Sequence, residues 1–86
     1  MTRNEILERV VAILEDKLDV LATEITEESY FESKYGEVQN LGADSLDKVK
    51  IIMEFEREFK INIPNDESEK LETVGQAVNY IYQNKC

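Results

Sequence analysis

The sequence contains no histidine and no tryptophan, and only one proline, three glycines and one cysteine among its 86 residues. Without histidine, the chain can form no imidazole triad, no histidine general base and no histidine-ligated metal site. The single cysteine, Cys86, excludes an intrachain disulfide and a metal site built from several thiolates. We therefore expect neither an enzyme of the common kinds nor a bound metal.

Basic residues are also scarce, since 10 lysines and arginines stand against 19 acids and the net charge is −9 at pH 7. Nucleic acids and anionic membranes require a cationic footprint, so we expect neither as a partner. No apolar run approaches the roughly 18 residues of a membrane span, and charged residues between Arg3 and Arg9 interrupt any signal peptide. We expect a cytoplasmic monomer whose acidic surface meets basic surfaces of other proteins.

The residues that are present predict helices. Apolar side chains recur at steps of three and four residues, and Thr73 with Gln76 has the spacing of a capping box. The predicted helices cover residues 3–18, about 44–59, 66–71 and 73–84. The segment 28–41 has no sustained periodicity and is interpreted as a long loop. The predicted fold class is all-α: one domain over residues 1–86, built as a small antiparallel bundle of three main helices plus one short helix.

The most informative segment is Leu41-Gly42-Ala43-Asp44-Ser45-Leu46-Asp47, which brings Ser45 to the start of the second predicted helix. One interpretation is structural, because Asp and Ser both favour the capping position of a helix. The other is chemical, because a phosphate on the Ser45 hydroxyl would lie near the positive end of the helix dipole. With no histidine and no G-x-S-x-G elbow, Ser45 is better suited to accept a group than to act as a catalytic nucleophile.

This segment and its surroundings resemble the acyl carrier proteins. The resemblance continues through the helix 49–59, the stretch Ile61-Asn62-Ile63-Pro64, the acidic turn 66–70 and Thr73-Val74. It implies that a phosphopantetheinyl transferase attaches 4′-phosphopantetheine from coenzyme A to Ser45. The thiol of that arm would hold acyl groups as thioesters and deliver them to acyl transferases and to enzymes of fatty-acid, polyketide or related synthesis. The chain itself would catalyse nothing.

The resemblance also implies roles for ten further residues. Those for recognition by the transferase and by partner enzymes would be Asp44, Leu46, Asp47, Met53 and Glu54. The acyl chain would fold back between the helices, against walls formed by Val49, Ile52, Ile63, Leu71 and Ala77. Each set also has a structural interpretation, since acids commonly form a solvated helix face and apolar residues commonly pack a core.

The sequence departs from the family's pattern in its long connection before the Ser45 segment. Residues Glu32 to Asn40 form an insertion or an alternative path, which leaves the positions of Tyr35 and Val38 open, and Asn40 stands where an acid is common.

Two lysines on the second helix are a further departure. Lys48 and Lys50 occupy positions that are usually neutral or acidic in general fatty-acid carriers, and Lys48 is four residues from Asp44, with which we expect it to pair. Both lysines are expected to dilute the acidic recognition surface, which favours a carrier for a dedicated pathway.

Two other functions stay open at this point. The cargo could be an aminoacyl or peptidyl group, as in carrier proteins of peptide-synthesising pathways. Alternatively, the chain could be an unmodified acidic helical module that bridges other proteins, in which case Ser45 would only be part of a helix start.

Overall fold

The computed structural model describes residues 2–32 and 40–84, and within these ranges the chain forms four α-helices, one 3₁₀ helix and one pair of short strands. The elements are α1 (Arg3–Leu18), η1 (Ala22–Glu24), β1 (Tyr30–Glu32), β2 (Asn40–Ala43), α2 (Ser45–Phe59), α3 (Asn65–Lys70) and α4 (Val74–Asn84). The predicted bundle of three main helices and one short helix is confirmed, and its helices begin and end within about one residue of the predicted positions.

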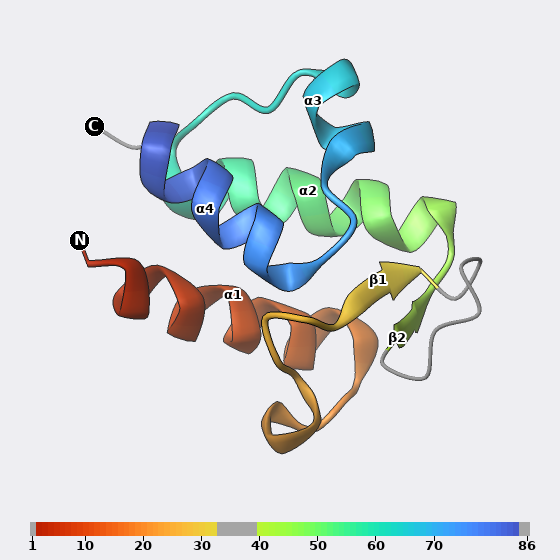
Figure 1. Cartoon of the computed structure of the whole chain (residues 1–86). Helices are drawn as coiled ribbons and strands as arrows, with labels where there is room; N and C mark the ends of the chain where they lie inside the picture. The colour runs from red at the N-terminus through yellow and green to blue at the C-terminus, as the bar shows by residue number, and fades with distance from the viewer. Residues whose placement is uncertain (1, 33–39, 85–86) are drawn as a thin grey trace.

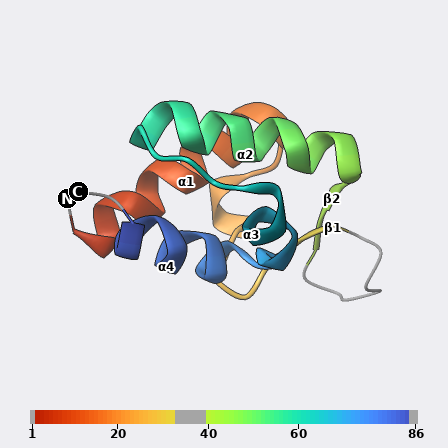
Figure 2. The same cartoon turned by 90° about the horizontal axis from the view of Figure 1, so that it is seen from above.

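The long helices α2 and α4 both pack against α1 (Figure 1). Seen from above, α2 and α4 lie on opposite sides, and α3 crosses between them on the face away from α1 (Figure 2). No helix in the described part of the chain is both long and apolar enough to cross a membrane.

Local hydrogen bonds fix where the first and last helices begin. At α1 the Thr2 hydroxyl accepts the Glu5 N–H at 3.2 Å, and the Glu5 carboxylate accepts the Thr2 N–H at 2.8 Å. At α4 the Thr73 hydroxyl accepts the Gln76 N–H at 3.3 Å, and the Gln76 carbonyl accepts the Thr73 N–H at 3.0 Å. Both are capping boxes, which satisfy N–H groups that the helix itself leaves without a partner.

Short strands replace part of the long loop that the sequence predicted over residues 28–41. β1 pairs in parallel with β2, so that Glu32 lies opposite Ala43. β1 is also tied to the chain before α4, where the Phe31 N–H donates to the Glu72 carbonyl at 3.0 Å. Strands of three and four residues are too short to show an alternating pattern in the sequence. The open question about Tyr35 and Val38 concerns positions outside the described residues.

The core lies between α1, α2 and α4 and is almost entirely apolar. Phe31 of β1 enters it, and its ring centroid lies 6.5 Å from that of Phe55. The fully buried large side chains are Ile6, Val10, Leu14, Phe31, Ile51, Phe55, Phe59, Val74, Val78 and Ile81. Burial of this apolar surface is the main term that stabilises a domain of this size.

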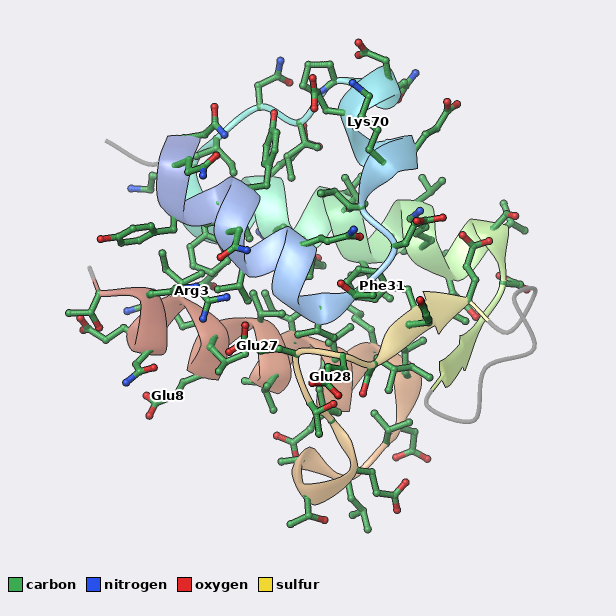
Figure 3. The ribbon with its side chains drawn as sticks, in the orientation of Figure 1. Arg3, Glu8, Glu27, Glu28, Phe31 and Lys70 are labelled. Atoms are coloured by element: carbon green, nitrogen blue, oxygen red, sulfur yellow. The ribbon has the colours of Figure 1, made fainter. Side chains whose placement is uncertain are left out.

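A polar contact joins the start of α1 to two distant segments. The guanidinium of Arg3 binds the Glu27 carboxylate through both Nη atoms, with Nη1 3.0 Å from Oε2, and its Nε donates to the Asn79 side-chain oxygen at 2.8 Å. Figure 3 shows the Arg3 and Glu27 side chains pointing toward one another. The hydrogen bond from Arg3 lowers the pKa of Glu27. The contact links α1, the segment after η1 and α4 on one side of the bundle.

Candidate functional site

Ser45 is the first residue of α2, and its side chain is exposed. The cap of this helix is Asp44, whose carboxylate accepts the Asp47 N–H at 2.8 Å, while the Asp47 carboxylate accepts the Asp44 N–H at 3.3 Å. Of the two residues that could cap the helix, the structure assigns the cap to Asp44. The Ser45 hydroxyl is not needed to start the helix.

The backbone turns sharply just before this helix. Gly42 has a φ of +74°, in the left-handed region that side-chain-bearing residues rarely adopt. A Cβ added to it would meet no atom within 4 Å, so the backbone angle rather than lack of space favours glycine here. This turn sets the direction in which β2 leads into Ser45.

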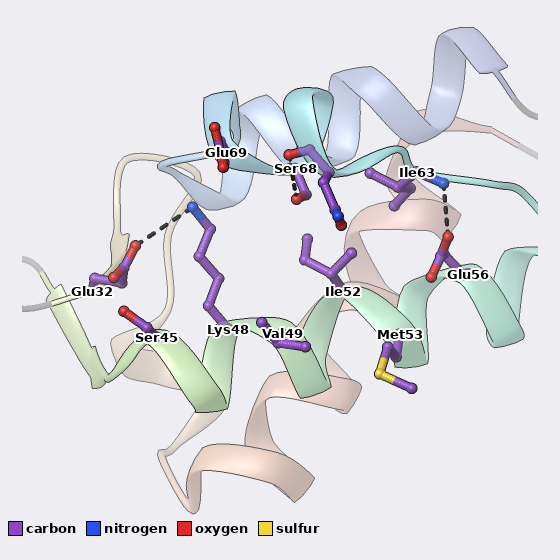
Figure 4. Close-up of a pocket in the computed structure, with 11 residues that line it drawn as sticks. Glu32, Ser45, Lys48, Val49, Ile52, Met53, Glu56, Ile63, Ser68 and Glu69 are labelled. Atoms are coloured by element: carbon purple, nitrogen blue, oxygen red, sulfur yellow. Dashed lines mark hydrogen bonds and ion pairs between the residues drawn. The ribbon is translucent and has the colours of Figure 1, made fainter.

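A cavity of about 630 Å³ opens beside Ser45, between α2 and α3 (Figure 4). Its lining residues are Glu32, Ser45, Lys48, Val49, Ile52, Met53, Glu56, Ile63, Asn65, Ser68 and Glu69. Most of these are polar or charged. The apolar members, from Val49 to Ile63, form its middle and its far end as seen from Ser45 in Figure 4.

The five residues predicted as acyl-chain walls fall into two groups. Val49, Ile52 and Ile63 line the cavity. Leu71 and Ala77 do not line it and are 5% and 0% exposed in the core, to which Ile52 and Ile63, at 6% and 4%, also belong. The spacing of apolar residues along the sequence could not separate these groups, because it does not show which helix covers which face.

Several polar residues were not predicted to line the cavity. The ion pair between two of them, Glu32 and Lys48, corrects an expectation about Lys48. Its Nζ lies 3.5 Å from the Glu32 carboxylate, and the two side chains are only 12% and 8% exposed. Lys48 therefore pairs with Glu32 rather than with Asp44, and it adds little to the outer surface. Lys50 is exposed and remains on that surface. No signal in the sequence points to Glu32, because the pairing of β1 with β2 is what brings it to the cavity.

The loop that closes the far end of the cavity is held by Glu56. Its carboxylate accepts the Ile63 N–H at 2.8 Å, which joins α2 to the chain before α3. Glu56 thus has a structural role, because it fixes the wall that carries Ile63.

The outer face of α2 carries an exposed apolar stripe among the acids. Leu46, Val49 and Met53 are 72%, 55% and 60% exposed. Beside them, Glu54 lies 3.8 Å from Lys17 and from Arg57. The residues predicted for partner recognition, Asp44, Leu46, Asp47, Met53 and Glu54, are thus all on α2 or at its start. Exposed apolar patches of this kind commonly mark protein-binding surfaces.

Comparison with known proteins agrees with the resemblance seen in the sequence. Residues 37–81 match the family described as "Phosphopantetheine attachment site", a range that includes Ser45. The acyl carrier protein of Porphyromonas gingivalis is 42% identical over 81 residues, covering 94% of this chain and 96% of its own. That of Amoebophilus asiaticus is 49% identical over 78 residues, covering 91% and 90%. The chain belongs to the acyl carrier protein family.

The fold agrees with this membership. A solved structure of the acyl carrier protein from Enterococcus faecalis superposes with a TM-score of 0.77, at 36% sequence identity, and the match covers 98% of this chain and 99% of that one. Acyl carrier proteins carry acyl groups and are not catalysts, so the prediction that this chain is not an enzyme is confirmed.

The cofactor of the acyl carrier family is 4′-phosphopantetheine, which is covalently attached and whose thiol holds the acyl group. The site around Ser45 fits such a group, because the hydroxyl is exposed, is not engaged in the cap and borders the cavity. In the part of the chain that the structure describes, no group of three or more Asp, Glu or Cys side chains is placed to hold a metal ion.

Proposed function

We propose that Ser45 is the attachment site of the 4′-phosphopantetheine arm, and that residues 1–86 act as one acyl carrier domain. The observation that carries this proposal is the division of roles at the start of α2. Asp44 caps the helix, while the adjacent Ser45 hydroxyl is exposed at the edge of a cavity. A phosphodiester on Ser45 would lie at the positive end of the 15-residue helix α2, which favours its negative charge.

Attachment replaces the hydroxyl proton of Ser45 by a phosphoryl group. The Ser45 oxygen forms a bond to the phosphorus that carries the pantetheine of coenzyme A, and the bond from that phosphorus to the nucleotide phosphate breaks. The adenosine bisphosphate leaves, and the transferase removes the proton. The contribution of the carrier is to present an exposed hydroxyl on a rigid helix start.

The partners would be a phosphopantetheinyl transferase, acyl transferases and synthase enzymes, met in the cytoplasm by a monomeric carrier. Recognition would use the exposed apolar stripe of α2 together with the acids beside it, namely Asp44, Leu46, Asp47, Met53 and Glu54. The net charge of −9 favours fast encounters with basic enzyme surfaces, because long-range charge raises association rates more than final affinity. Such encounters suit a carrier that must visit several enzymes in turn.

The cargo would be an acyl chain of fatty-acid or related synthesis. The relatives at 42% and 49% identity are named acyl carrier proteins, which supports this class over an aminoacyl or peptidyl carrier. The unmodified interaction module is the second alternative, and the cavity beside Ser45 argues against it.

Intact mass spectrometry tests the attachment site. The protein and its Ser45→Ala variant would be incubated with coenzyme A and a broad-specificity phosphopantetheinyl transferase. We expect the parent to gain the mass of one arm and the variant to gain none. If a folded parent gains nothing, the interaction module replaces the carrier as the function.

A second step tests the cargo class. The modified parent would be offered to a malonyl transferase and, separately, to an enzyme that loads activated amino acids. We expect transfer of the malonyl group. Loading by the amino acid enzyme alone would instead assign the chain to the aminoacyl or peptidyl carriers.

A further inference from the structure

The two departures from the family's pattern meet at one place in the structure. Glu32 ends β1 at the start of the inserted segment, and Lys48 lies in the first turns of α2. Their charged groups are 3.5 Å apart, and both residues line the cavity beside Ser45. The insertion and the unusual lysine therefore act together, because the first supplies the counter-charge for the second.

The ion pair makes one end of the cavity polar. Ser45, Glu32 and Lys48 lie together at that end in Figure 4, and Glu69 of α3 faces them. The apolar lining from Val49 and Ile52 begins further along. An arm attached to Ser45 that folds back over this end would bring the carbons nearest the thioester past the ion pair as the acyl chain enters the cavity.

A saturated chain and an oxygen-bearing chain meet this end differently. The Glu32 and Lys48 side chains are mostly buried, and hydrocarbon laid over them would remove their remaining water without replacing its hydrogen bonds. A hydroxyl or carbonyl oxygen can accept a hydrogen bond from the lysine ammonium, which has three N–H donors. A hydrogen bond that involves a charged donor is among the stronger ones.

We propose that the Glu32–Lys48 pair is a specificity determinant of the cavity, which selects acyl chains with an oxygen on the third carbon over saturated chains of the same length. The favoured cargo would be a 3-hydroxyacyl or 3-oxoacyl group. This inference rests on the proposed attachment of the arm to Ser45.

Thermal unfolding of acyl-loaded forms tests the selection. Hydrolysis-resistant amide analogues of hexanoyl and 3-hydroxyhexanoyl coenzyme A would be loaded by the transferase, and intact mass would confirm loading. The parent would be compared with a Glu32→Gln/Lys48→Met double variant, which removes both charges and keeps similar side-chain lengths. Lys50→Met is the matched control, because it removes a lysine charge from an exposed position of the same helix.

In the parent and in Lys50→Met, we expect the 3-hydroxy chain to raise the melting temperature above that of the hexanoyl form, by on the order of 5 °C. In the double variant we expect that difference to vanish or reverse. A parent that prefers the saturated chain, or a double variant that keeps the parent's preference, would overturn the inference while leaving the carrier function intact. A parent that cannot be loaded at all would overturn the proposed function, and this inference with it.

Thermal unfolding of the unloaded forms shows whether the double variant is folded. If it is not, the single variants Lys48→Met and Lys48→Arg provide the comparison. Lys48→Arg keeps the cation and is expected to keep the parent's preference. Lys48→Met removes the N–H donors and is expected to lose that preference, so a Lys48→Met variant that keeps it, or a Lys48→Arg variant that loses it, would contradict the inference.

Discussion

The two sides of α2 differ in what covers them. On the side toward α1 and α4, Ile51, Phe55 and Phe59 are 1%, 0% and 1% exposed. On the side toward α3 and solvent, Val49 and Met53 are 55% and 60% exposed, although they lie within the same turns of the helix. One helix thus serves both as a core element and as the surface on which the candidate site is built.

This difference shows how a small domain keeps an open site without losing its fold. The closed side supplies the apolar burial that stabilises the bundle, and so fixes which way the open side points. The open side then has room for a cavity, an ion pair and an exposed hydroxyl. Changes on the closed side should therefore alter stability, while changes on the open side should alter recognition and cargo.

The largest effect is expected from Phe55→Ala on the closed side. Removing a fully buried aromatic side chain leaves a cavity in the core, and we expect the free energy of unfolding to fall by about 3–5 kcal/mol. Met53→Ala on the open side is the matched control, with an expected change of about 0.5 kcal/mol or less. Urea unfolding at neutral pH measures both. Similar losses in the two variants would contradict the division between the sides.

An intermediate effect is expected from Glu56→Ala. The Ile63 N–H would lose its carboxylate acceptor at 2.8 Å, and we expect a loss of about 1 kcal/mol because the bond is charge-assisted but only partly buried. Amide hydrogen exchange should be faster at Ile63, with little change at core amides of α1. Glu54→Ala removes a neighbouring acid of α2 and is expected to leave the exchange at Ile63 unchanged. Equal protection of Ile63 in parent and Glu56→Ala would show that the loop is held by other contacts.

The closed side could be predicted from the sequence because its information is local. Apolar residues of α1 and α2 recur at helical spacing, and the caps at Thr2 and Thr73 lie at fixed distances from Glu5 and Gln76. Such patterns need no knowledge of the rest of the chain. The position of Ser45 at the start of a helix could likewise be predicted, because the residues that form this start are continuous in the sequence.

The open side could not be predicted in the same way, because long-range contacts build it. Glu32 reaches Lys48 only because β1 lies beside β2, and three-residue strands leave no periodic signal. That Ile52 lines the cavity and Leu71 does not also depends on where α3 lies. The predicted pairing of Lys48 with Asp44 was wrong for the same reason, since a partner distant in sequence competes with the one four residues away.

The smallest effect is expected at acid pH, and it should arise from the contact between Arg3 and Glu27 rather than from the open side of α2. The hydrogen bond from Arg3 lowers the pKa of Glu27 below that of an unfolded carboxyl, about 4.3. Glu27 therefore contributes stability above that pH, and the contribution is lost as the pH falls through the lower, folded value.

Glu27→Gln should be less stable at neutral pH and should lose less stability on acidification. Glu8→Gln removes an exposed acid of α1, the helix that carries Arg3, and should keep the parent's slope. The Glu5 carboxyl, whose pKa is lowered mainly by its hydrogen bond from the Thr2 backbone, should leave some acid sensitivity in every variant. Urea unfolding between pH 3 and 7 measures these slopes, and equal slopes for parent and Glu27→Gln would place the acid sensitivity elsewhere.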